Sequence, residues 1–282
     1  MNEQNFDYLS RQLKFTGFGE EIQRALLEKL QLQLPEFTLH HHASIGSDKV
    51  EAALQFSKSA QSDMYFFNRY QLMIKNEKGD ESLAQTFRVG RENNITLKEA
   101  YNLMHGRAVH KEMTPKEGEK YNAWLQLDFK QTEENGNFKF QQYHQNYGYD
   151  LRQTLAKYPI RELEKAETAQ SLVRSLERGN RHQVTMVQEG KENKMFIEAN
   201  PKYKSITVYN SDMLRVNVHS EKLSSPEKQS EKKTERQAVA RETPVEEIKK
   251  KKHSKRQALK GEDGEAGSQK QKLTRKQSQT LS

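Results

Sequence analysis

The side chains most suited to chemistry in this sequence form a run of cations near its C-terminus. Seven of the eight residues from 249 to 256 are Lys, Arg or His. Flexible cationic segments attract nucleic-acid phosphates without sequence specificity, because binding releases condensed counterions. The run therefore predicts contact with DNA or RNA through Lys249, Lys250, Lys251, Lys252, Lys255 and Arg256. The alternative is a tail that only keeps the chain soluble or docks a protein, since Asp and Glu are interspersed through it.

The net charge of the chain is concentrated in the same region. Residues 1–219 contain 30 Lys and Arg against 29 Asp and Glu, whereas residues 220–282 contain 17 against 10. The basic residues of the tail therefore carry +7 of the formal net charge of +8. Residues 220–282 also lack Phe, Tyr and Trp, so they cannot bury enough apolar surface to offset the entropy lost on ordering. We predict that this segment is a disordered basic tail.

Three consecutive histidines, His40, His41 and His42, raise the question of a metal site. In an extended strand His40 and His42 point to one side and His41 to the other, so at most two of them can share an ion. Relaxases of mobile elements use a His-hydrophobe-His strand, but here the central residue is another His. No third ligand has matching spacing, so we predict polar residues on an exposed strand and no metal. An enzyme that acts on DNA with this strand is a third, less favoured hypothesis.

A second motif with a catalytic parallel is Asp128-Phe129-Lys130, which follows a strand pattern. It matches the acidic-x-Lys half of a common nuclease core, but three residues are too few to be diagnostic, and a turn at the end of the strand is the favoured explanation. The chain has no cysteine, which excludes disulfides, zinc-thiolate sites and thiol nucleophiles. No Ser-His-Asp order or kinase signature is present, so we predict a protein that is not an enzyme and has no cofactor.

Two groups of aromatic residues allow two interpretations. They could form a platform on which bases stack, or they could pack in the core and on the sheet faces, as aromatic residues in strands usually do. The packing interpretation is favoured. The residues are Tyr65, Phe66, Phe67 and Tyr70, and later Tyr143, Tyr147 and Tyr149.

The elements that position these residues follow from hydrophobic periodicity. Residues 1–34 predict two short helices, with Leu9 and Leu13 on one face of the first and Pro35 after the second. From residue 36 to residue 88 the period changes to two, which predicts four antiparallel strands. Thr96 and Glu99 form a capping-box pattern at the start of a further helix.

The sequence from residue 103 to residue 128 is repeated later in the chain. Leu103 and Leu176, Gly106 and Gly179, and Met113 and Met186 are each 73 residues apart. Each copy predicts a helix followed by a three-stranded meander, so the copies indicate a duplicated scaffold. Arg107 is the one distinctive exposed candidate within the repeat, and the second copy does not keep it.

Several segments resemble a conserved uncharacterised protein family of Bacteroidales conjugative transposons, which contains a repeated domain of unknown function. The resemblance covers roughly residues 1–215. It is carried by FDYLSRQLKFTGFGE, SDMYFFNRYQL, NNITLKEAYNLMHGRAVHKE, KYNAWLQLDF, YHQNYGYDL, LERGNR and FIEANPKYK. The family has no assigned catalytic residues. The resemblance implies a bacterial accessory of DNA mobility, located in the cytoplasm.

The sequence thus predicts an α+β protein with antiparallel sheets, short helices and duplicated helix-plus-meander units. The predicted divisions are residues 1–94, 95–163, 164–219 and the tail 220–282. The first functional hypothesis is a non-enzymatic accessory of a conjugative element that contacts DNA or RNA through its tail. The second is a protein-interaction adaptor or inhibitor, which uses its sheet faces to bind a protein of the conjugation machinery. The N-terminus lacks a signal pattern and no apolar run approaches the length of a membrane span, so we expect a cytoplasmic protein without membrane contact.

Overall fold

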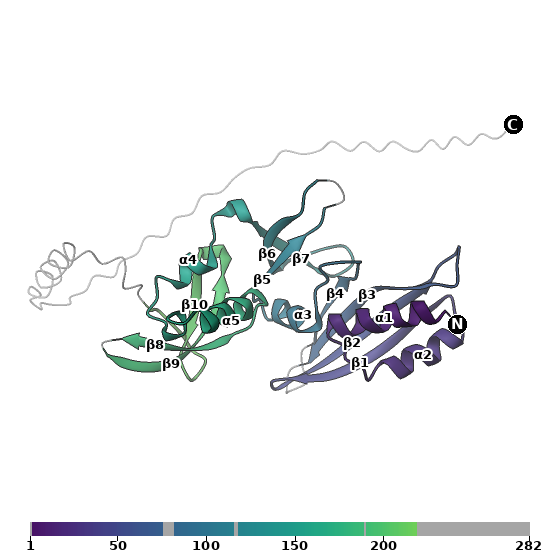
Figure 1. Ribbon diagram of the computed structural model, residues 1–282, viewed down its shortest axis with the longest axis horizontal. Helices are drawn as coiled ribbons and strands as arrows, with labels where there is room; N and C mark the ends of the chain where they lie inside the picture. The colour runs from purple at the N-terminus through teal and green to yellow at the C-terminus, as the bar shows by residue number, and fades with distance from the viewer. Residues whose placement is uncertain (1, 76–81, 116–117, 189, 219–282) are drawn as a thin grey trace, which may run out of the picture. The chain divides into compact units, whose positions relative to one another are not determined.

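A computed structural model describes residues 2–75, 82–115, 118–188 and 190–218 (Figure 1). The chain starts with the two predicted helices, α1 (Glu3–Thr16) and α2 (Gln23–Gln31). At the start of α1 the side chain of Asn2 accepts a hydrogen bond from the backbone N–H of Asn5. Gly17 ends the helix with a φ of 90°, a left-handed conformation that favours glycine.

The next four strands form one antiparallel sheet, sheet A. Its strands are adjacent in chain order: β1 (Glu36–Ile45), β2 (Asp48–Lys58), β3 (Tyr65–Lys75) and β4 (Ser82–Arg88). Side chains buried at alternate positions, such as Leu54 and Phe56 of β2, pack beneath α1 and α2, which cover one face of the sheet (Figure 1). The intervening side chains on the opposite face are mostly exposed or half-buried. The prediction of four antiparallel strands with a period of two is confirmed.

The two copies of the repeat have the predicted order of elements. In the first copy α3 (Leu97–Met104) is followed by β5 (Val109–Met113), β6 (Tyr121–Thr132) and β7 (Phe138–His144), which form sheet B. In the second copy α5 (Ala166–Glu177) is followed by β8 (His182–Gln188), β9 (Lys191–Asn200) and β10 (Ser205–Tyr209). A short strand, β11 (Arg215–Val216), extends the second meander to the four-stranded sheet C. The α+β class with antiparallel sheets is therefore correct.

The segment between the copies is more regular than its sequence pattern indicates. It contains the short helix α4 (Leu151–Leu155) and the 3-10 turns η1 (Gln145–Tyr147) and η2 (Arg161–Leu163), and a third 3-10 turn, η3 (Pro201–Tyr203), lies between β9 and β10. The predicted capping box of α3 is present. The Thr96 hydroxyl accepts from the N–H of Glu99 at 3.3 Å, and the Glu99 carboxylate accepts from the N–H of Thr96 at 2.9 Å.

The two faces of strand β6 belong to two hydrophobic cores. Ala123, Leu125 and Leu127 join the core formed by sheet A, α1, α2 and α3. Trp124 points the other way, into the core formed by α4, α5 and sheet C. The prediction that Trp124 lies on the opposite face of the strand from Leu125 and Leu127 is confirmed, so β6 contributes side chains to both cores.

The predicted tail, residues 220–282, lies outside the described residues. The predicted boundaries near residues 95, 164 and 220 stay predictions. In the part of the chain that the structure describes, no helix combines the length and the apolar character needed to cross a membrane.

Candidate functional site

The six cationic residues predicted to contact nucleic acid lie outside the described part of the chain. They are Lys249, Lys250, Lys251, Lys252, Lys255 and Arg256. Contact through them stays a prediction. The structure instead shows where the other candidate residues lie and which surfaces they form.

The three histidines alternate along β1 as expected. His40 and His42 are exposed, and His41 is half-buried against the ring of Phe18, with ring centroids 5.6 Å apart. Burial lowers the pKa of His41. The carboxylate of Glu51 is 3.9 Å from Nδ1 of His40. Among the described residues, no three His, Cys, Asp or Glu side chains gather in a way that could hold a metal ion.

Most of the first aromatic group packs in the core. Tyr65, Phe67 and Tyr70 are at most 3% exposed, while the intervening Phe66 is 47% exposed. Burial raises the pKa of Tyr70 well above its usual value. In the second group Tyr149 is buried and Tyr147 is exposed, and Tyr143 is half-buried. The buried rings are not available to stack on bases, so these residues do not form a continuous stacking platform. The packing interpretation holds for the buried ones.

The carboxylate of the Asp128-Phe129-Lys130 motif accepts hydrogen bonds from groups within sheet B. One carboxylate oxygen of Asp128 accepts from the N–H of Lys130 at 3.0 Å, and the other accepts from the amide of Gln141 at 2.8 Å. The register of β6 against β7 shifts directly after Asp128. The motif lies inside β6, which continues to Thr132, so the predicted turn at the end of the strand is wrong. The carboxylate instead stabilises an irregularity within the strand.

Arg107 is not the exposed residue that the sequence suggested. Burial lowers the pKa of its guanidinium, and its Nη2 donates to Oδ1 of Asn102 at 2.6 Å. The amide of Asn102 in turn donates to the carbonyl of Arg178 and to Oδ1 of Asn180 in the second copy. The prediction failed because the second repeat packs against the end of α3 and covers Arg107. Arg107 therefore belongs to the joint between the repeats.

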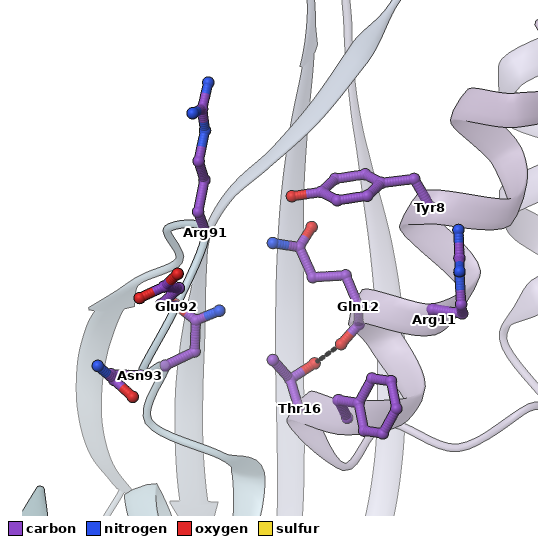
Figure 2. A pocket seen from close by; sticks show the side chains of 9 residues that line it. Tyr8, Arg11, Gln12, Thr16, Arg91, Glu92 and Asn93 are labelled. Atoms are coloured by element: carbon purple, nitrogen blue, oxygen red, sulfur yellow. Dashed lines mark hydrogen bonds between the residues drawn. The ribbon is translucent and has the colours of Figure 1, made fainter. Parts of the chain in front are cut away.

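A groove between α1 and the loop of residues 90–94 was not predicted. Leu9 and Leu13 face the core, so the opposite side of the helix presents Tyr8, Arg11 and Phe15. The groove has a volume of about 510 Å³. Figure 2 shows Tyr8 and Gln12 reaching from the helix towards the loop. We call this surface the α1 groove.

Side-chain hydrogen bonds fix the loop that forms the other wall of the α1 groove. Oδ1 of Asn94 accepts from the N–H of Gly90 at 2.7 Å, and its Nδ2 donates to the carbonyl of Gly90 at 3.1 Å. Gln12 crosses the groove and donates to the same carbonyl at 2.9 Å. Asn93 has a φ of 57°, a conformation that Asn tolerates better than most residues. The loop is thus held at a defined position beside α1.

The α1 groove combines exposed aromatic rings with cations. Phe15 is 78% exposed and Tyr8 is 40% exposed. Within the described residues, neither Arg11 nor Arg91 forms an ion pair, while the carboxylate of Glu92 binds Lys120 at 3.0 Å. Aromatic faces next to uncompensated guanidinium groups are suited to planar, anionic ligands such as nucleotides. The groove is therefore the candidate binding site of the described part.

The sequence did contain a signal for this groove. Tyr8, Arg11 and Phe15 recur at three- and four-residue spacing, which places them on the helix face opposite Leu9 and Leu13. Large aromatic residues on the polar face of an amphipathic helix are unusual. The loop that completes the groove could not be anticipated, because its position depends on contacts with residues about 80 positions earlier in the chain.

Comparison of the chain with protein-family models, curated proteins and solved structures finds no match.

Proposed function

We propose that the protein is a non-enzymatic accessory of a conjugative mobile element that contacts nucleic acid through its basic tail. The observation that carries the proposal is the distribution of charge. Residues 1–219 are nearly neutral, and residues 220–282 contain 17 Lys and Arg against 10 Asp and Glu. The element context comes from the family resemblance described above.

The folded part supports the same ligand class. The α1 groove presents Tyr8 and Phe15 beside Arg11 and Arg91, a combination used for bases and phosphates. The other notable polar residues, such as Asp128, have structural hydrogen-bond partners. Binding, rather than a reaction, is the function that these arrangements favour.

The test neutralises the six predicted tail contacts in the full-length protein by changing each Lys and Arg to Gln. DNA affinity is then measured by fluorescence anisotropy between 50 and 300 mM salt, on the order of the range where counterion release is seen. If all six contact phosphates, the slope of log K against log salt becomes less steep by about 5 for duplex DNA. A slope that does not change overturns the tail assignment.

A matched control removes cations from another part of the same tail. Lys270, Lys272, Arg275 and Lys276 are changed to Gln in the same full-length background. We expect a smaller effect on the salt slope than from the run at 249–256, because fewer charges are removed and acidic residues precede them. If both variants reduce the salt slope by the same amount per charge removed, the cations of the whole tail contribute equally to binding.

The adaptor hypothesis is favoured by apolar side chains on sheet B. Phe129 of β6 is 42% exposed and Phe140 of β7 is 37% exposed. In a pull-down from cells that carry the element, an adaptor retains its protein partner after nuclease treatment. The double variant Phe129→Ser and Phe140→Ser then loses this partner, whereas a nucleic-acid accessory loses its partners with the nuclease alone.

A further inference from the structure

The open face of sheet A carries two arginines directly opposite each other. Arg69 of β3 and Arg88 of β4 are Cα partners in the antiparallel register, and both are exposed. Like charges at directly opposite positions of two strands destabilise a sheet. Among the described residues, neither guanidinium has a carboxylate within ion-pair distance. The pair is therefore positively charged without compensation.

A β-bulge adds polar groups to this pair. The register between β2 and β3 shifts so that Gln55 faces Arg69 while Phe56 faces Phe67. Asn68 is the extra residue, and both it and Arg69 are exposed. Bulges of this kind re-aim side chains and are frequent next to functional sites.

Hydrogen bonds to neutral groups hold the two bulge side chains. Nε of Arg69 donates to Oε1 of Gln55 at 2.6 Å, and Nδ2 of Asn68 donates to Oγ of Ser57 at 2.6 Å. This fixes the Arg69 side chain while leaving its charge uncompensated. With Arg88 and Glu36, these residues line a hollow of about 360 Å³, which we call the arginine hollow. Glu36 lines the hollow too, but among the described residues its carboxylate forms no ion pair with either guanidinium, so both arginines are suited to bind a phosphate.

A third hollow lies between the arginine hollow and the α1 groove and shares lining residues with each. It is a groove of about 460 Å³ along β4 and β7 and shares Arg69 and Arg88 with the arginine hollow. The same groove shares Glu92, Asn93 and Asn94 with the α1 groove. A ligand long enough to follow all three would meet a phosphate site at one end and exposed aromatic rings at the other. A small anion would use only the first.

We propose that a single-stranded nucleic acid follows these three adjoining hollows, with Arg69 and Arg88 holding a backbone phosphate and Tyr8 and Phe15 stacking on bases. Single strands fit better than duplexes because their bases are free to stack on aromatic side chains. The proposal rests on the proposed function for its ligand class, but it places a second binding site in the folded part of the chain.

The test uses full-length protein with the six tail cations at 249–256 changed to Gln, which removes the predicted tail contacts and leaves the described part unchanged. The probe is a fluorescein-labelled 20-nucleotide oligothymidylate in about 0.1 M salt, a length chosen to exceed the site of a single small domain. Each phosphate contact on a single strand is worth about fivefold at this salt concentration, so Arg69→Gln with Arg88→Gln weakens binding about 25-fold. Tyr8→Ala with Phe15→Ala weakens it as well.

The matched control is Arg174→Gln with Arg178→Gln, two exposed arginines of α5 or its C-terminal cap that remove the same charge. The proposal is overturned if this control weakens binding as much as the Arg69 and Arg88 variant. It is also overturned if a duplex of the same length or a phosphoserine peptide competes as well as the unlabelled strand. A melting temperature equal to or above that of the parent shows that the Arg69 and Arg88 variant is folded.

The same variants separate the two proposals. If the tail variant binds as tightly as the parent and the Arg69 and Arg88 change alone weakens binding, the tail proposal fails and this one stands. If the tail variant shows no residual binding of the oligothymidylate, this proposal fails and the tail proposal stands.

Discussion

The two repeat units share one order of elements but differ in what surrounds them. In the first, β6 is covered on both faces, with Leu125 in one core and Trp124 in the other. In the second, β9 contributes Ile197 to a core on one side only, and its neighbour Glu198 pairs with Arg181 at 2.7 Å on the other. The first unit therefore has an apolar core on both faces of its sheet, whereas the second has an apolar core on one face and buried polar side chains on the other.

The repeated glycine shows the same difference at one position. Gly106 and Gly179 both end a helix and both have positive φ, 74° and 76°. A Cβ on Gly106 would meet only Cε2 of Phe129, at 3.4 Å. A Cβ on Gly179 would lie 2.9 Å from the carbonyl oxygen of Ala108. The first glycine serves the turn alone, whereas the second also lets the two repeats approach closely.

At the contact between the repeats, one side chain of the first copy also differs from its counterpart in the second copy. Asn102 is 1% exposed and bonds to Arg178 and Asn180 of the second copy. Its counterpart 73 residues later is Ser175, which bonds within its own copy, to Asn180 and His182. The two units thus share an order of elements, and the side chain at this position differs so that the first copy bonds to the second.

Gly179→Ala has the largest expected effect. A non-glycine residue at this φ costs about 1–2 kcal/mol, and crowding against backbone adds about 1–3 kcal/mol. We therefore expect the free energy of unfolding to fall by about 2–5 kcal/mol, measured by urea denaturation. Gly106→Ala is the matched control and loses only about 1–2 kcal/mol, because the Phe129 ring can move. Equal losses would contradict the difference between the two glycines.

Asn102→Ala has the next largest effect. It removes two hydrogen bonds to the second repeat and leaves the Arg107 guanidinium without its acceptor, which costs about 2–3 kcal/mol. Ser175→Ala, at the equivalent position, costs about 1 kcal/mol because its bonds are local and partly exposed. Denaturant unfolding of both variants measures the difference. A double variant with Arg107→Ala should lose less than the sum of the two single variants, since the residues share a bond.

The repeat and the sheets could be predicted because their signals are local. The period of two along β2, the capping box at Thr96 and the alternation around Trp124 depend on residues close in sequence. The short helix α4 was not predicted, since Leu151–Leu155 is too short to show a helical period. Its position depends on packing in the second core, where Leu151 and Leu155 are buried.

The candidate site was harder to predict than the fold. The arginine hollow depends on the bulge at Asn68, which was not predicted although the alternation of β3 changes phase there, from Tyr65 and Phe67 to Tyr70 and Leu72. Arg107 was assigned to the surface because its sequence neighbours gave no sign of the second repeat. The face of α1 that carries Tyr8 and Phe15 could have been identified from helical spacing alone, without its loop.

The smallest expected effect concerns pH and compares His110 with its counterpart Gln183, 73 residues later. His110 packs on Trp124 with ring centroids 5.1 Å apart, and burial lowers its pKa, which nearby Glu177 partly offsets. The unfolded chain therefore binds this proton more readily, so the protein loses stability as pH falls below about 6.5, the usual pKa of His. We expect His110→Gln to lose less free energy of unfolding than the parent between pH 7.5 and about 5.5, a range that spans this pKa. Some loss remains because burial also lowers the pKa values of His41, His105 and His182.

Gln183→His is the reverse control. Position 183 is exposed, so a histidine there should leave the pH dependence of the free energy of unfolding unchanged. If Gln183→His increased the loss of stability at low pH as much as His110→Gln reduced it, the difference between the repeats would be contradicted.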